Sequence, residues 1–153
     1  MIKLSYRGSD NMIERCYVMV KPGFVNRKII NDTKKALEAN GVTLEESALI
    51  RYDEETARLH YIEKSGKSYI KELTDYLSEG EAYGMIFIGD NALKICRDTV
   101  EGLRHSLKEK YNLQTDVMRN ILHCSSKTKV GDTMLELDTQ REIALFHYLK
   151  NKE

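Results

Sequence analysis

A histidine at the end of a short apolar run is the residue in this chain best placed to support chemistry. Residues 117–126 read Val-Met-Arg-Asn-Ile-Leu-His-Cys-Ser-Ser, so His123 follows apolar residues and precedes small polar ones. Arg119 and Asn120 precede it, and another apolar run ends at Lys21. An unprotonated imidazole can attack phosphorus, and nearby donors can stabilise phosphoryl oxygens. The pattern favours phosphoryl transfer, although an isolated histidine in this setting is more often structural.

Other phosphate-handling motifs do not occur in the sequence. It has no Gly-x-x-x-x-Gly-Lys-Ser/Thr loop and no Gly-rich loop combined with a His-Arg-Asp motif. Phosphoryl chemistry in this chain would therefore use the histidine.

Length and composition indicate one globular domain. The chain has 153 residues, of which 41% are hydrophobic and 31% charged, and Lys plus Arg equals Asp plus Glu at 24 each. This balance gives no global field that would attract nucleic acid or anionic lipid. The apolar stretches are too short to span a membrane, and the first residues lack the apolar core of a signal peptide. We expect a soluble cytoplasmic protein without nucleic-acid or membrane partners.

The cysteines and histidines do not form a recognisable metal-binding or disulfide pattern. Cys16, Cys96 and Cys124 make neither a Cys-x-x-Cys pair nor an even framework, which is typical of reduced thiols in a cytoplasm. The four histidines are dispersed and lack metal-ligand spacing. We expect no metal site built from protein ligands alone.

Hydrophobic periodicity predicts alternating strands and helices. Strands are expected at residues 14–21, 42–52, 81–89 and 117–124. Helices are expected at residues 26–40, 54–63, 67–78, from 91 toward 110, and 138–150, with a polar loop at 125–137. Residues 1–13 are expected to form an N-terminal extension to a domain at 14–153. This order favours an α+β fold in which one antiparallel sheet is covered by helices.

The segment before the histidine raises a geometric question. Strict alternation along a straight strand would place Asn120 and His123 on opposite faces of a sheet. If both residues serve one site, the backbone has to bend between them.

Two sequence runs carry a family resemblance. Arg119, Asn120, His123 and Ser125 form an Arg-Asn-x-x-His-x-Ser run, and the earlier run reads Arg-Cys-Tyr-Val-Met-Val-Lys-Pro-Gly-Phe-Val. Together they resemble the nucleoside diphosphate kinase family over about residues 14–149. The chain departs from that family at Cys124, where the family has glycine, and at Ser126, Gly23 and Phe24. The resemblance implies a ferredoxin-like βαββαβ antiparallel sheet with an inserted helical hairpin.

The resemblance also implies a catalytic set. His123 would be the nucleophile, and Glu142 in the Glu-Ile-x-x-Phe run would orient it, across a longer intervening segment than the family usually has. Lys21 would offset charge on the transferred phosphoryl group, and Tyr61 would hydrogen-bond near the nucleophile. Without the resemblance, Lys21 is equally an ordinary strand-end lysine and Tyr61 an ordinary amphipathic side chain.

Substrate-binding residues follow from the same resemblance. They would be Lys21, Tyr69, Leu73, Arg97, Lys108, Asn120 and Ser125. Tyr69 and Leu73 would face a nucleobase, whereas without the resemblance both would be interpreted as core residues.

Two cations would contact the inner phosphates of the nucleotide. Arg97 matches one family arginine, although it could equally be a solvated residue at a helix end. Lys108 would replace a second family arginine, with Arg104 able to compensate for the lost bidentate geometry. Residues 98–105 are expected to be a shortened replacement for a family loop.

The leading interpretation is a nucleoside diphosphate kinase that works through phospho-His123. Its partners would be nucleoside di- and triphosphates, and Mg²⁺ would bind through the nucleotide phosphates. The resemblance further implies a homo-oligomer built from dimers. The alternative is a divergent nucleotide-binding or regulatory domain with weak or no turnover, motivated by the family departures. An acylphosphatase-like or RNA-binding module would need a basic or aromatic strand pattern that the sequence lacks.

Overall fold

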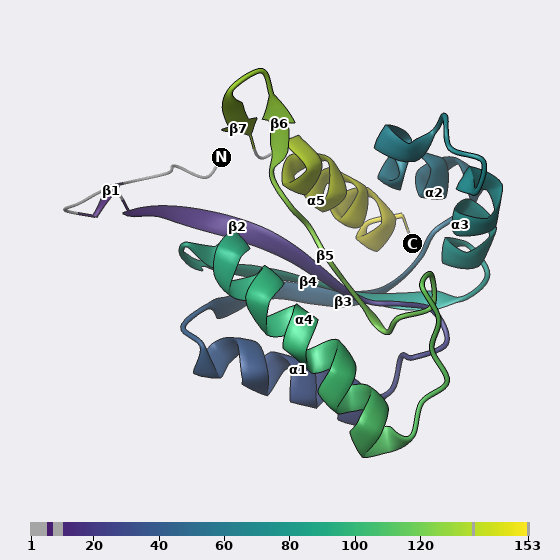
Figure 1. Cartoon of the computed structure of the whole chain (residues 1–153), viewed down its shortest axis with the longest axis horizontal. Helices are drawn as coiled ribbons and strands as arrows, with labels where there is room; N and C mark the ends of the chain where they lie inside the picture. The colour runs from purple at the N-terminus through teal and green to yellow at the C-terminus, as the bar shows by residue number, and fades with distance from the viewer. Residues whose placement is uncertain (1–5, 8–10, 136, 153) are drawn as a thin grey trace.

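The chain is built around an antiparallel sheet with helices on both faces (Figure 1). The computed structural model describes residues 6–7, 11–135 and 137–152. The sheet contains β1 (Tyr6–Arg7), β2 (Asn11–Val20), β3 (Thr43–Arg51), β4 (Glu81–Asp90) and β5 (Leu122–Cys124). The strand order is β1-β2-β4-β3, and β5 pairs with β2.

Strand β2 is the centre of this arrangement. One of its edges pairs with β4 from Ile13 to Val20. Its other edge pairs with β1 near Asn11 and with β5 near Val20. In this register Met19 lies opposite His123, so the predicted nucleophile lies beside the end of the strand that leads into Lys21.

Helices cover the two faces of the sheet in two groups. Helices α1 (Arg27–Ala39) and α4 (Ala92–Tyr111) pack on one face, where Val18 and Val20 of β2 contribute to the core. Helices α2 (Glu54–His60), α3 (Ile70–Leu77) and α5 (Leu137–Lys150) pack on the other face, against Tyr17 and Met19. The two faces use alternate residues of β2 because successive side chains of a strand point in opposite directions.

Helix α5 approaches the sheet closely at Gly84 of β4. A Cβ atom at this position would lie 2.6 Å from the Phe146 ring and 2.8 Å from the Tyr17 hydroxyl. Phe146 is fully buried and lies one helical turn after Glu142. Gly84 therefore allows α5 to dock where Glu142 can reach β5.

Local signals define the ends of the first helices. The side chain of Asn26 accepts a hydrogen bond from the Ile29 N–H and caps α1. Asp53 and Thr56 form a reciprocal capping box at the start of α2. A single 3₁₀ turn, η1 (Ile62–Lys64), follows α2 before the chain enters α3.

The predicted α+β topology is confirmed, with helices α2 and α3 as the inserted hairpin between β3 and β4. The prediction of a strand at 117–124 is wrong for residues 117–121, because pairing with β2 begins only at Leu122. Residues 98–105, the expected shortened replacement for a family loop, are helical and lie inside α4.

Two segments differ from their predicted polar, irregular character. Residues 125–137 contain a hairpin of β6 (Thr128–Val130) and β7 (Thr133–Leu135). In the predicted N-terminal extension, β1 pairs with β2, which itself begins at Asn11. Residues 1–5 and 8–10 of that extension lie outside the described part of the chain.

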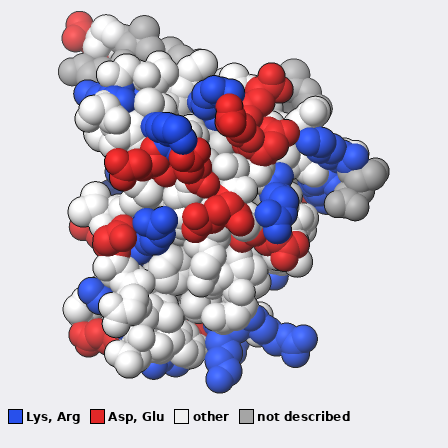
Figure 2. Space-filling model, turned by 90° about the vertical axis from the view of Figure 1, so that its right-hand side faces the viewer, with Lys and Arg blue, Asp and Glu red and all other residues white. Residues whose placement is uncertain are grey.

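Surface charge and helix composition are consistent with the balanced sequence. One face of the molecule shows acidic and basic side chains interspersed, with no extended area of a single sign (Figure 2). Among the described residues, no helix combines the length and apolar character needed to cross a membrane.

Candidate active site

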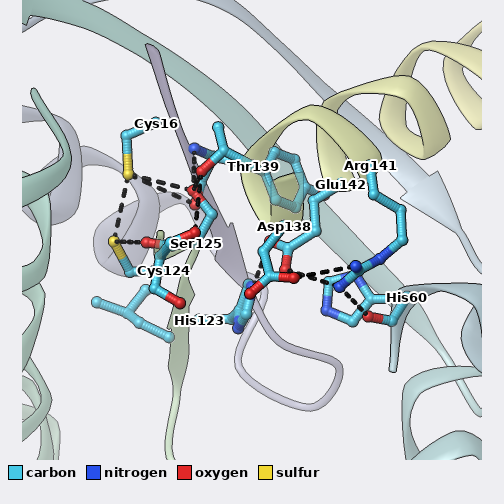
Figure 3. Close-up of polar contacts among 12 residues, drawn as sticks. Cys16, His60, His123, Cys124, Ser125, Asp138, Thr139, Arg141 and Glu142 are labelled. Carbon is cyan, nitrogen blue, oxygen red and sulfur yellow. Dashed lines mark hydrogen bonds and ion pairs between the residues drawn. The ribbon is translucent and has the colours of Figure 1, made fainter. Parts of the chain in front are cut away.

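The centre of the candidate site is a pair formed by His123 of β5 and Glu142 of α5 (Figure 3). Nε2 of His123 lies 2.6 Å from Oε1 of Glu142, and the two side chains are 20% and 4% exposed. An ionised carboxylate accepts a hydrogen bond and so holds the ring proton on Nε2. Among the described residues, Nδ1 of His123 has no hydrogen-bonding partner. The pairing therefore leaves one ring nitrogen able to act as a nucleophile.

Burial shifts the protonation of both partners. Burial, together with the positive charge of Lys21, lowers the pKa of His123 to about 3. The imidazole is therefore neutral near pH 7 and retains a lone pair. Burial raises the pKa of Glu142 to about 7, and the neighbouring His60 and the charge of Arg141 offset only part of this rise. The protonation state of Glu142 thus changes in the physiological range.

A sharp turn at Ile121 supplies the bend that the sequence required. Ile121 has φ +78°, and the N–H of Leu122 donates to the carbonyl oxygen of Asn120 at 2.9 Å. This is a strained γ-turn, which is uncommon for a β-branched residue. The N–H of Lys21 donates to the Ile121 carbonyl at 2.8 Å, and the Ile121 side chain is fully buried. The turn joins the Asn120 segment to the strand that carries His123.

Lys21 and Asn120 form the polar contact next to this turn. Nζ of Lys21 donates to Oδ1 of Asn120 at 2.7 Å and to the carbonyl oxygen of Met118 at 3.1 Å. Burial and the charge of Arg104 lower the pKa of Lys21 to about 8. The cation is therefore held near His123 by acceptors that do not neutralise it.

Helix α4 provides further cations. Nε and Nη2 of Arg104 donate to the carbonyl oxygen of Leu122 at 3.1 and 3.0 Å, directly before His123. Arg97 and Arg104 line one pocket of about 200 Å³ together with Cys124. Lys108 is exposed and makes no side-chain hydrogen bond or ion pair with the described residues. The structure thus brings Arg104, in place of Lys108, to the His123 strand.

His60 occupies the position beside His123 that the sequence resemblance gave to Tyr61. The His60 and His123 ring centroids are 4.8 Å apart, and Tyr61 packs edge-on against His60 at 4.7 Å. Tyr61 is buried and makes no hydrogen bond to His123 in the described structure. Burial lowers the pKa of His60 to about 3, and neither of its ring nitrogens has a hydrogen-bonding partner among the described residues. His60 is therefore neutral, and Tyr61 packs against His60 rather than against His123.

Arg141 links α5 to the helical hairpin. Its Nη2 donates to the carbonyl oxygen of His60 at 3.2 Å (Figure 3). The same Nη2 also donates to Oε2 of Glu63 at 2.7 Å. These bonds tie the residue next to Glu142 to the hairpin, so α5 and α2 position the Glu142–His123 pair jointly.

The remaining predicted site residues differ in accessibility. Tyr69 is 42% exposed, whereas Leu73 is partly buried against the core on the α5 face. Ser125 was expected to contact substrate, but it is 1% exposed. Its hydroxyl accepts hydrogen bonds from the Tyr17 N–H and the Thr139 hydroxyl, both at 2.9 Å. Ser125 in this arrangement holds β5 to β2 and α5.

One group of described residues has the composition of a metal site. Ligand atoms of His60, His123 and Glu142 lie within 4.8 Å of one another. Two imidazoles and one carboxylate do not suit Mg²⁺, which prefers oxygen ligands in octahedral geometry. A magnesium ion used here would have to be held mainly by a bound substrate.

Sequence reasoning considered Arg104 only as a cation that could compensate for Lys108, and it gave no role to Arg141. Arg104 lies one helical turn before Lys108 on α4. His60 precedes Tyr61 in a His-Tyr pair that resembles the family's, but its place beside His123, like the contacts of Arg141, depends on how α2 and α5 pack together.

Comparisons with known proteins show the family of the chain. A family model described as nucleoside diphosphate kinase matches residues 14–147. A nucleoside diphosphate kinase of Listeria welshimeri is 30% identical over 140 residues, covering 88% of this chain and 88% of that protein. One from Natronomonas pharaonis is 32% identical over 139 residues, covering 87% and 85%.

Solved structures show the same similarity. The halophilic nucleoside diphosphate kinase of Halobacterium salinarum in complex with CDP is 29% identical, with a TM-score of 0.66, over 87% of this chain and 86% of that chain. The Aquifex aeolicus nucleoside diphosphate kinase is 20% identical, with a TM-score of 0.69, over 88% and 94%. At that identity the second comparison supports the fold alone.

Proposed function

Because the chain belongs to the nucleoside diphosphate kinase family, we propose that it transfers the terminal phosphoryl group of a nucleoside triphosphate to a nucleoside diphosphate through His123. The observation that carries this proposal is the His123–Glu142 pair, which leaves Nδ1 without a partner among the described residues. A neutral imidazole with one free lone pair is what attack on phosphorus requires.

The reaction proceeds in two matching steps. Nδ1 of His123 attacks the terminal phosphorus, the bond from that phosphorus to the bridging oxygen breaks, and the nucleoside diphosphate leaves. A second nucleoside diphosphate then uses its terminal oxygen to take the phosphoryl group from Nδ1. Glu142 accepts the Nε2 hydrogen bond throughout, so it stabilises the positive charge that develops on the ring.

Cations around His123 serve the phosphoryl oxygens. The Lys21 ammonium lies beside Asn120 and donates to its Oδ1. The side-chain amide N–H groups of Asn120 have no partner among the described residues, so they can also donate to phosphoryl oxygens. Arg104 adds positive charge next to Leu122, and Arg97 lines the same pocket as Arg104. These groups offset the negative charge that the phosphoryl group carries during transfer.

The substrates are nucleoside di- and triphosphates of varied base. The exposed ring of Tyr69 offers a stacking surface, and stacking accepts any base because each has a π-face. Mg²⁺ would be held through the nucleotide phosphates, where it would neutralise part of their charge. In keeping with the family, the protein works in the cytoplasm as a homo-oligomer built from dimers, an assembly that light scattering at micromolar concentration would measure.

The proposal is tested by incubation with Mg²⁺ and ATP labelled on the terminal phosphate. The expected product is an acid-labile, base-stable phosphoprotein that is discharged by added nucleoside diphosphate. His123→Ala should abolish labelling, whereas His105→Ala, at an exposed position on α4, should retain it. Full labelling of the His123→Ala protein would overturn the assignment of the nucleophile.

A divergent, non-catalytic nucleotide-binding domain is the second candidate. The continuous helix α4 across residues 98–105 favours it, because this segment stands in place of a loop that the family has and this chain lacks. Saturable nucleotide binding by calorimetry, with neither phosphoprotein nor transfer, would support this candidate over the first.

A further inference from the structure

The cysteines of this chain, which are far apart in sequence, meet at one place in the fold. Cys16 lies on β2, Cys96 on α4 and Cys124 on β5. Sγ of Cys16 lies 3.3 Å from Sγ of Cys124 (Figure 3). A hydrogen bond with Cys16 also raises the pKa of Cys96, so the third thiol belongs to the same cluster.

Strand pairing explains why Cys16 and Cys124 face each other. Cys124 is the register partner of Val18, and Cys16 precedes Val18 by two residues on the same strand. Residues two apart on a strand share a face, so both thiols point toward the α4 side of the sheet. The Ser125 N–H also donates to the Tyr17 carbonyl at 2.8 Å, which holds the two backbones together beyond the paired residues.

One of the two sulfurs can be reached from solvent. Cys16 is fully buried, whereas Cys124 is partly exposed and lines the pocket that contains Arg97 and Arg104. The pocket has a volume of about 200 Å³, which is large enough for a small oxidant. Cys96 is fully buried, so the accessible thiol and its nearest sulfur neighbour are Cys124 and Cys16.

We propose that Cys16 and Cys124 form a reversible disulfide when the protein meets hydrogen peroxide, and that this bond restrains the strand carrying His123. Cys124 stands where the family resemblance has glycine, so the sulfur of this pair on β5 is a departure from the family pattern.

The reaction balances in two steps. The Cys124 sulfur attacks one peroxide oxygen, the O–O bond breaks, and the products are a sulfenic acid and one water molecule. The Cys16 sulfur then attacks the Cys124 sulfur, the S–O bond breaks, and the hydroxyl leaves as a second water with the thiol proton. Overall, two thiols are oxidised and one peroxide is reduced to two waters.

Bond formation requires movement at β5. A disulfide has sulfurs about 2.05 Å apart, so the present contact must shorten by about 1.2 Å. Cys124 is joined to His123 by one peptide bond, and the rigid partner is β2, paired on its far edge with β4. The displacement therefore falls mainly on β5 and changes the aim of the His123 ring on the opposite face.

The first part of the test detects the disulfide itself and does not depend on the proposed function. The full-length protein would be treated with hydrogen peroxide, and its thiols alkylated and examined by peptide mass spectrometry. We expect the free thiol count to fall from three to one, with a cross-linked peptide pair containing Cys16 and Cys124 that dithiothreitol separates. Three retained thiols, a Cys16–Cys96 cross-link, or overoxidised Cys124 without a cross-link would each overturn the proposal.

The functional arm rests on the proposed phosphoryl transfer. Oxidation should slow phosphohistidine formation by about 10- to 100-fold, since a displacement of about 1 Å can cost that much, and dithiothreitol should restore it. Cys124→Ala should resist peroxide in both arms, with Cys124→Ser as a second variant of similar size. Cys96→Ala is the matched control and should still form the cross-link. A cross-link without slower transfer would overturn the restraint on His123, whereas no transfer even before oxidation would instead count against the proposed function.

Discussion

Nε2 of His123 and Oε1 of Glu142 lie 2.6 Å apart, although the residues are separated by 19 positions and lie on β5 and α5. The contact exists because Phe146 of α5 packs against Gly84, where no Cβ intervenes. Arg141, next to Glu142, binds His60 and Glu63 and ties the same helix to the hairpin. The His123 ring is thus oriented by the docking of a whole helix onto the sheet.

Replacing Glu142 by Gln should slow phosphoryl transfer. The amide removes the negative charge that stabilises the positive ring during attack, so we expect kcat to fall by about 100-fold with little change in KM for nucleotide. Initial-rate assays that follow transfer of a labelled phosphoryl group at varied nucleotide concentration would measure both kcat and KM. Glu38→Gln, at an exposed position on α1, serves as the matched control. A normal kcat in the Glu142→Gln protein would show that the pair does not orient the nucleophile.

On the acidic side of the pH–rate profile, the rate of phosphoryl transfer should rise with pH. When Glu142 is protonated, below its pKa of about 7, it donates to Nε2, and the ring proton then occupies Nδ1. The nucleophilic lone pair is lost, so kcat should fall about tenfold per pH unit below that value. In Glu142→Gln this limb should disappear. A pH-independent rate across this range in the unsubstituted protein would contradict the prediction.

On the alkaline side of the pH–rate profile, activity should decline as Lys21 loses its proton. Its pKa is lowered to about 8 by burial and by Arg104, so its charge is lost above that value. Loss of a cation beside the phosphoryl group should lower kcat/KM at alkaline pH. Arg104→Ala removes one cause of the lowered pKa and should move this limb to higher pH. A limb that stays in place in this variant would show that another group titrates.

At position 121, a glycine substitution should destabilise the protein less than an alanine substitution, which is the reverse of the usual order. Its φ of +78° is strained for any residue with a Cβ, at about 1–3 kcal/mol. Ile121→Ala loses buried contacts and keeps the strain, whereas Ile121→Gly loses the contacts and relieves it. We expect both to lower the free energy of unfolding in urea, with glycine about 1 kcal/mol more stable than alanine. The ordinary order, with alanine the more stable, would count against strain at this turn.

Arg104 and Lys108 test which cation of α4 serves the site. Arg104 donates two hydrogen bonds to the Leu122 carbonyl, whereas the Lys108 side chain is exposed. We expect Arg104→Ala to lower kcat/KM by about tenfold and Lys108→Ala to lower it less, because only Arg104 reaches the His123 strand. A larger loss in Lys108→Ala would restore the assignment made from sequence resemblance.

The sequence was sufficient to predict most of the helices and strands and to identify the Arg-Asn-x-x-His-x-Ser run. Hydrophobic periodicity and caps such as Asn26 and Asp53 act within a few residues, so the alternation of strands and helices could be predicted. The prediction failed at residues 117–121, where a strand was expected but pairing with β2 begins only at Leu122. The need for a bend before His123 was visible from strand alternation, but its position at Ile121 was not.

Tertiary structure alone decided which distant groups meet. Cys16 and Cys124 are 108 residues apart, and their contact depends on the register of β5 against β2. His60, Arg104 and Arg141 reach the site only because α2, α4 and α5 dock on the sheet at particular positions. Burial, which shifts the pKa values of His123, Glu142 and Lys21, arises from the same packing. Residue order encodes local conformation directly, whereas these contacts and pKa shifts result from the simultaneous packing of segments that are remote in sequence.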